Sequence, residues 1–131
     1  MLLMLWAGSL WSLLWVAATL FNLQSDRHLA GAIAARLFGI ETYLGLAVAA
    51  LSFAVSGRRR HRELYFAAAI LALNEWILKP VMGRALVQGT AAGLGFGAWH
   101  GVSAALYLIA CVAVLVLVWK EVWVARGPSP E

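Results

Sequence analysis

Four long apolar runs, separated by short polar breaks, divide this chain. We expect them to form helices over about residues 3–23, 30–56, 63–87 and 96–119. Each is about 20 residues or longer, which at 1.5 Å per residue is enough to cross a hydrocarbon core about 30 Å thick. The pattern therefore predicts an all-α fold, an integral membrane four-helix bundle. It forms a single transmembrane domain over residues 1–126, followed by a disordered tail at 127–131.

The first apolar run has a competing interpretation as a signal peptide. Met1 to Leu23 contains no charged side chain, so the basic segment that opens a signal peptide is missing. The apolar core of a signal peptide is also shorter, about 7–15 residues. The run is therefore predicted to be the first membrane span.

Basic residues cluster between the second and third runs, at residues 58–62. In a soluble protein such a cluster could indicate nucleic-acid binding. Between two apolar spans it marks a cytoplasmic loop. With four spans, both termini are then cytoplasmic, which agrees with Lys120 and Arg126 after the last run. No nucleic-acid partner is expected; the partner is the lipid bilayer.

Composition supports the membrane interpretation. Hydrophobic residues make up 63% of the 131 positions and charged residues 12%, whereas soluble domains have about 45–50% and about 25%. The chain has no room for a separate soluble domain beside four spans. Its one cysteine, Cys111, excludes an intramolecular disulfide.

The third run is interrupted by polar residues between Asn74 and Arg84. Glu75 and Lys79 are four residues apart, so on a helix they share a face in the order that favours an ion pair. Pro80 lacks an N–H and should kink the helix. Charges at membrane depth usually face a protein interior or a wet cavity. The pair is interpreted either as part of a functional polar pocket or as a purely structural ion pair.

Helical rise places several polar residues of different spans at one level. Counted from the inner face, Glu41, Glu75, Lys79 and His100 lie at depths of about 25, 18, 24 and 28 Å, in the outer half of the membrane. We therefore predict a polar pocket in that half. Its members are Arg36, Glu41, Asn74, Glu75, Lys79, His100 and Ser103.

The chemistry of this set favours a proton, a small cation or a small polar solute, because burial and neighbouring charges can shift the proton affinity of carboxylates and histidine. No His-x-x-His or Cys-x-x-Cys pattern is present, so no metal is predicted. A haem held by His28 and His100 is disfavoured because His28 lies in a loop. No catalytic residue and no cofactor are assigned, and the protein is not expected to be an enzyme.

The alternative function is a non-transporting accessory or scaffold subunit of a larger membrane complex. Gly31, Ala35 and Gly39 recur every four residues in the second run. Small residues at that spacing allow close helix packing. Four helices are few for a transporter, so a homo-oligomer or a membrane-complex partner is expected if the protein moves a solute.

Three stretches carry a resemblance to a known family: residues 36–45, the Lys79-Pro80 step, and residues 99–107 with their His-Gly-x-Ser step. They resemble a bacterial family of four-span membrane proteins of unknown function, similar to transmembrane-protein-205-like proteins. Relatives often have Gln-Pro where this chain has Lys79-Pro80. The resemblance implies a multi-pass protein of the bacterial inner (plasma) membrane and supplies no catalytic residues.

Overall fold

The computed structural model describes residues 2–56 and 62–125. Most of the basic cluster (residues 58–61) and the tail at 127–131 lie outside the described residues, and so does the side chain of His28. The predicted cytoplasmic loop and the predicted tail are therefore predictions that the structure does not address. The expected loop position of His28 is wrong, because the backbone of His28 is the second residue of the helix Arg27–Ser56.

Four helices of the described chain are long and apolar enough to cross a membrane. This confirms the predicted all-α, four-helix membrane fold. The third of them is built from three consecutive helical segments. The elements are α1 (Leu2–Leu23), α2 (Arg27–Ser56), α3 (Arg62–Leu73), η1 (Asn74–Leu78), α4 (Lys79–Gln88) and α5 (Phe96–Ala125).

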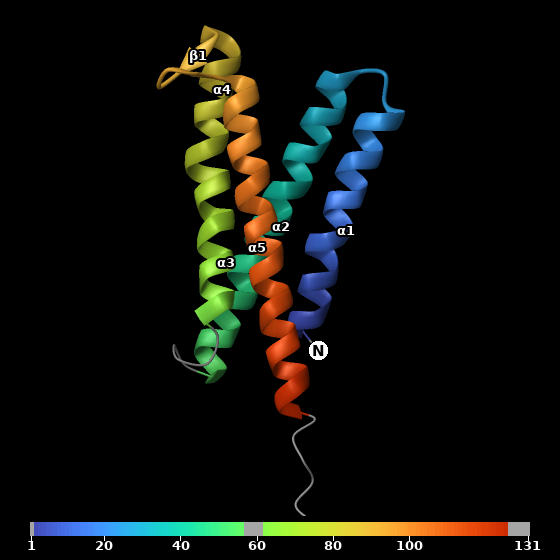
Figure 1. Ribbon diagram of the computed structural model, residues 1–131, viewed down its shortest axis with the longest axis vertical. Helices are drawn as coiled ribbons and strands as arrows, with labels where there is room; N and C mark the ends of the chain where they lie inside the picture. The colour runs from blue at the N-terminus through green and yellow to red at the C-terminus, as the bar shows by residue number, and fades with distance from the viewer. Residues whose placement is uncertain (1, 57–61, 126–131) are drawn as a thin grey trace, which may run out of the picture.

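A short connection joins α1 to α2 and makes the two helices antiparallel (Figure 1). Asp26 precedes the first residue of α2, and its Oδ1 accepts a hydrogen bond from the backbone N–H of Leu29 at 3.1 Å. The aspartate thus caps one of the N–H groups that a helix leaves unpaired at its start.

The glycine-rich loop before α5 has regular secondary structure of its own. It forms a two-stranded antiparallel hairpin, β1 (Thr90–Ala91) paired with β2 (Leu94–Gly95). The two turn residues, Ala92 and Gly93, have φ of 49° and 79°. Positive φ at both central positions matches the right-handed twist of a hairpin, and glycine tolerates it without a Cβ clash.

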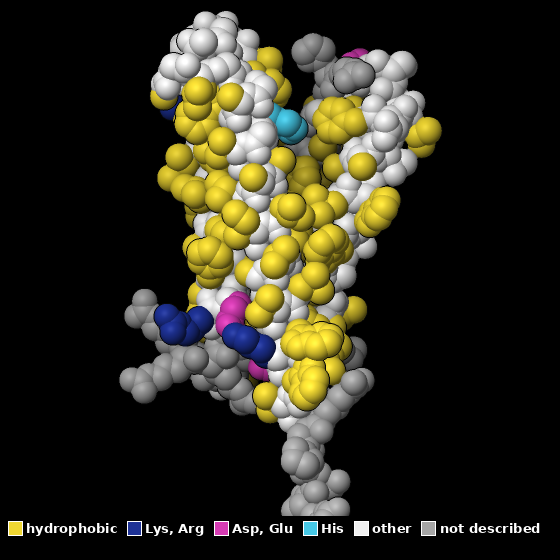
Figure 2. Space-filling view, viewed as in Figure 1, with side chains coloured by type: hydrophobic (Ala, Val, Ile, Leu, Met, Phe, Trp, Pro, Cys, Tyr) yellow, Lys and Arg dark blue, Asp and Glu magenta, His cyan; other side chains and the backbone are white. Residues whose placement is uncertain are grey.

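The helices are tightly packed at one end of the bundle and diverge at the other (Figure 1). The buried core joins the first half of α1 to α3 and the later part of α5, and its largest fully buried side chains are Trp6, Leu10, Leu64, Leu71, Cys111, Val114 and Leu117. Towards the hairpin, α4 packs on α5 while α2 packs on α1. Figure 2 shows an open gap between these two arms.

Candidate functional site

The polar stretch of the third span folds as a π-helix, η1, between α3 and α4. The backbone N–H of Lys79 donates to the carbonyl of Asn74, five residues earlier. Pro80 follows at the first turn of α4, where its missing N–H is tolerated. The predicted interruption thus takes the form of a wider helical turn, a feature often found at functional sites.

Glu75 and Lys79 form the ion pair that their spacing predicts, with 2.5 Å between Nζ and Oε1. Lys79 Nζ also donates to the carbonyl of Ala35 on α2, at 3.3 Å. A Cβ added at Gly39 would lie 3.4 Å from Glu75 Oε1. Ala35 and Gly39 therefore face this pair, so that the pair connects α2 to the third span.

The predicted small-residue stripe is only partly a contact surface. An added Cβ at Gly31 would meet nothing within 4 Å, so this glycine does not bring two helices together in the described chain. Among the glycines of α2, Gly45 lies closest to the side chains of other helices. A Cβ there would be 2.6 Å from Trp6 Cζ2 and 3.2 Å from Leu71 Cδ1.

Glu41 lies on another face of α2, directed at α1. Its residue is 6% exposed, and its Oε1 is 2.9 Å from the hydroxyl of Ser9. The same hydroxyl is 2.8 Å from the carbonyl of Trp6. Trp6 Nε1 is buried without a hydrogen-bond partner among the described residues. Among the described residues, Lys79 pairs with Glu75 and Lys120 pairs with Glu63, so neither of these lysines pairs with Glu41.

Ser9 was not among the residues that the sequence singled out, although a simple signal exists. Ser9 lies fourteen residues before the end of α1 at Leu23, and Glu41 lies fourteen residues after the start of α2 at Arg27. Residues equally far from the connection of two antiparallel helices lie at the same level. Counting residues from the α1–α2 connection therefore places Ser9 at the level of Glu41.

Tyr107 of α5 closes the interior on the side of Ser9 and Glu41. It is 5% exposed, and its hydroxyl donates to the carbonyl of Leu10 on α1 at 3.1 Å. Its ring packs edge-on against Phe38 of α2, with centroids 4.7 Å apart. α5 thereby holds α1 and α2 together next to the buried carboxyl group.

The contacts that the structure describes divide the seven residues of the predicted pocket into separate groups. Glu75 and Lys79 form one group. Asn74 forms a second, because its Nδ2 donates to the backbone carbonyl of Ser103 at 3.4 Å while its Oδ1 is buried and unpartnered among the described atoms. Glu41 is hydrogen-bonded to Ser9 and belongs to neither group.

The remaining two members, Arg36 and His100, are exposed. His100 stacks on Phe96, one turn earlier in α5, with ring centroids 5.8 Å apart and an interplanar angle of 16°. This ring contact of His100 is with a residue of its own helix. Neither residue is therefore part of an enclosed site in the described structure.

The levels of these residues also differ from the expected outer layer. Glu75 lies thirteen residues from each end of the third span, Arg62 and Gln88, and Glu41 is within one residue of the middle of α2. His100 is four residues into α5, about 6 Å from its start. The two carboxyl groups are thus near the middle of their helices, a position that the predicted bounds 63–87 already gave for Glu75.

Within residues 2–56 and 62–125, no group of three or more His, Cys, Asp or Glu side chains is arranged to hold a metal ion. The fold and its interior carboxyl groups define a multi-pass α-helical membrane protein with ionisable groups at mid-span. Residues 1–91 match the family described as Domain of unknown function (DUF4149). The chain belongs to that family.

The matched region includes Glu41, Glu75 and Lys79 but ends before α5, which carries the His-Gly-x-Ser step. No curated protein and no solved structure matches the chain. The family description assigns no activity, so the functional argument depends on the geometry of the interior.

Proposed function

We propose that the protein handles protons within the membrane, and that Glu41 is the group that binds and releases them. The observation that carries this proposal is a carboxyl group at mid-span that is buried next to a serine hydroxyl. An ionised carboxylate without a cation is costly in a low-dielectric interior and is usually neutralised by a proton. Ionisable groups inside a membrane bundle commonly serve proton pathways.

The contacts of Ser9 are compatible with the protonated form of Glu41. A serine hydroxyl has one hydrogen to donate, yet two oxygens, Glu41 Oε1 and the Trp6 carbonyl, lie within 2.9 Å of it. Both contacts are hydrogen bonds at once when the carboxylic acid donates to Ser9 and Ser9 donates to the carbonyl. The network is complete with one proton on Glu41.

Glu75 makes a useful contrast because its charge is already balanced. Lys79 lies 2.5 Å away, and the lysine side chain is 41% exposed while that of Glu75 is 16% exposed. The Glu75 carboxylate thus has a lysine ammonium beside it, whereas neither of the lysine ion pairs in the described chain includes Glu41. The two mid-span carboxyl groups are therefore expected to be neutral in different ways, Glu41 by protonation and Glu75 by pairing.

Release of the proton would leave a negative charge beside the Ser9 hydroxyl, and neither lysine ion pair of the described chain includes Glu41. A carboxylate at this depth requires water or a cation. Proton release is therefore coupled to water entry or to a shift of α1 against α2. The same position could accept a small cation in place of the proton, which an ion-dependence experiment distinguishes.

Infrared difference spectroscopy of the purified protein in lipid tests the proposal. At neutral pH the wild type should show the C=O band of a protonated carboxylic acid, and Glu41→Gln should remove it. Glu75→Gln is the matched control at the same depth and should leave the band in place. Ser9→Ala should shift the band, because the acid loses its hydrogen-bond partner. A band that persists in Glu41→Gln would refute Glu41 as the proton site.

A transport assay separates proton binding from proton movement. In liposomes that contain a pH-sensitive dye, an imposed potential should drive proton uptake through the wild type and at least about ten-fold less through Glu41→Gln. Sodium or potassium uptake with the same dependence on Glu41 would indicate a cation instead. Absence of any flux from the wild type would restrict Glu41 to a structural or sensing role.

The accessory-subunit function is retained as a second candidate because of Arg36. This side chain is exposed nine residues into α2, about 14 Å along the helix. A guanidinium at that position needs a partner or must extend to the interface. A carboxylate of another membrane subunit would provide one. Loss of a stoichiometric copurifying protein in Arg36→Gln would support docking, and an unaccompanied wild type would argue against it.

The resemblance to a bacterial family of four-span membrane proteins supports placement in a bacterial inner membrane. The basic cluster between α2 and α3 supports an orientation with both termini cytoplasmic. In that orientation the hairpin and the α1–α2 connection face the outside.

A further inference from the structure

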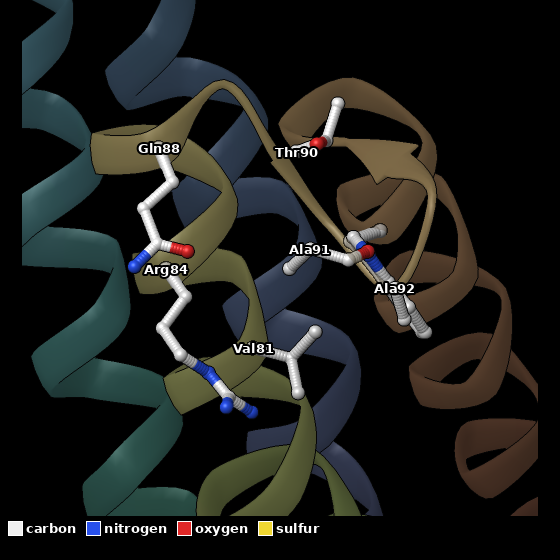
Figure 3. A pocket seen from close by; sticks show the side chains of 7 residues that line it. Val81, Arg84, Gln88, Thr90, Ala91 and Ala92 are labelled. Carbon is white, nitrogen blue, oxygen red and sulfur yellow. The ribbon is translucent and has the colours of Figure 1, made fainter.

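A separate pocket lies at the hairpin end of the bundle, away from Glu41. Its volume is about 280 Å³, and α4, the hairpin and the start of α5 enclose it. Figure 3 shows Val81, Arg84 and Gln88 in succession along α4, with Ala91 and Ala92 of the hairpin across from them. The lining is completed by Thr90 and Trp99.

The polar lining of this pocket is cationic and rich in donors. Arg84 supplies a guanidinium, Gln88 an amide and Thr90 a hydroxyl, and no Asp or Glu lines the space. In the part of the chain that the structure describes, Glu75 pairs with Lys79 and Glu63 pairs with Lys120, so neither of these carboxylates pairs with Arg84. A guanidinium presents several N–H donors in a planar fork that matches the oxygens of a phosphate. The lining therefore selects an anion.

The hairpin gives this pocket a fixed wall. Trp99 Nε1 donates to the carbonyl of Ala91 at 2.8 Å, which ties the start of α5 to the first strand. The turn then continues through Ala92 and Gly93 with positive φ. Ala91 and Ala92 add an apolar side to the lining, so the occupant combines an anionic group with an apolar or neutral part.

The position of the pocket along the helices indicates that the occupant is a lipid headgroup. Arg84 lies four residues before the end of α4 at Gln88, about 6 Å from the helix end. This is the headgroup level of a membrane, where tryptophan and arginine are favoured. Pockets for drug-sized ligands begin at about 300 Å³, so the space suits a group of headgroup size.

We propose that this pocket binds a phosphate group, as a phospholipid headgroup carries it. Arg84 pairs with the phosphate oxygens, and Gln88 and Thr90 donate to the remaining oxygens or to headgroup hydroxyls. The site is independent of proton binding at Glu41, which lies on another helix. Binding between α4 and α5 would hold the diverging arm of the bundle in place.

Thermal unfolding of the detergent-purified protein tests the site with three probes: short-chain phosphatidylglycerol, short-chain phosphatidylcholine and inorganic phosphate. Phosphatidylglycerol should raise Tm by binding the folded state. Arg84→Gln should weaken its apparent affinity about ten-fold or more, because a charge-assisted pair is lost. Arg84→Lys keeps the charge but not the planar fork and should give an intermediate value.

Arg62→Gln is the matched control, because it removes an exposed arginine at the start of α3, at the opposite end of the third span from Arg84, and should leave the phosphatidylglycerol effect intact. A response to phosphatidylglycerol and not to inorganic phosphate assigns the lipid headgroup as the source. An equal, Arg84-dependent response to inorganic phosphate supports the phosphate site with a soluble ligand. Equal Tm shifts in wild type and Arg84→Gln for every probe would overturn the proposal.

Discussion

Replacement of Gly45 by alanine tests whether the tight end of the bundle is packed as described. The new Cβ would lie 2.6 Å from Trp6 Cζ2 and 3.2 Å from Leu71 Cδ1, whereas carbon atoms pack at about 3.5–4.0 Å. Both Trp6 and Leu71 are only 1% exposed. Neither ring nor branched side chain has free space to move into, so the clash must displace α1 or α3 from α2.

The expected cost is about 1–3 kcal/mol, the usual range for overpacking a filled core. Gly31→Ala is the control in the same helix, because its added Cβ meets nothing within 4 Å. Both variants gain the same helix propensity, up to about 1 kcal/mol, so the difference between them isolates the clash. Gly45→Ala should therefore be about 1–3 kcal/mol less stable than Gly31→Ala.

Reversible unfolding in mixed micelles of dodecyl maltoside and dodecyl sulfate, followed by circular dichroism, measures this difference. Trp6→Phe removes the clashing Cζ2. In the Trp6→Phe background, Gly45→Ala should therefore lower the free energy of unfolding by only about 0.5 kcal/mol or less. The four proteins together form a double-mutant cycle for the contact. Equal stability of Gly45→Ala and Gly31→Ala would refute the contact between Trp6 and α2. It would also weaken the placement of Ser9 opposite Glu41, since Trp6 and Ser9 lie on the same helix.

Two further predictions concern polar contacts between helices. Tyr107→Phe removes the hydrogen bond to the α1 backbone and should lower the free energy of unfolding by about 0.5–1.5 kcal/mol. Tyr43→Phe, at an exposed position, is the control and should have no measurable effect in the same micelles. Equal effects of the two substitutions would contradict the contact. Lys79→Met leaves Glu75 unpaired and should lower both stability, measured by thermal unfolding, and yield. The double variant Glu75→Gln/Lys79→Met should recover most of this loss, because it also removes the unpaired carboxylate. A double variant no more stable than Lys79→Met would show that the lysine acts without the carboxylate.

The amino-acid pattern by itself determined the membrane fold. Four apolar runs of sufficient length have one way to satisfy their backbone in lipid, which is to form helices. The Glu75–Lys79 pair was also predictable, because residues four apart on a helix meet without help from the rest of the chain. The break before Pro80 follows from the missing N–H of proline.

Tertiary structure decided which polar residues meet across helices. Height along a helix can be counted from the sequence, but the rotation of each helix about its axis depends on packing. Gly45 admits the ring of Trp6, and this contact accompanies an orientation of α2 in which Glu41 faces Ser9 while Gly39 faces Glu75. His100 stacks on its own helix instead. Residues that the count placed in one outer layer are therefore separated, with a buried acid at one contact and an ion pair at another.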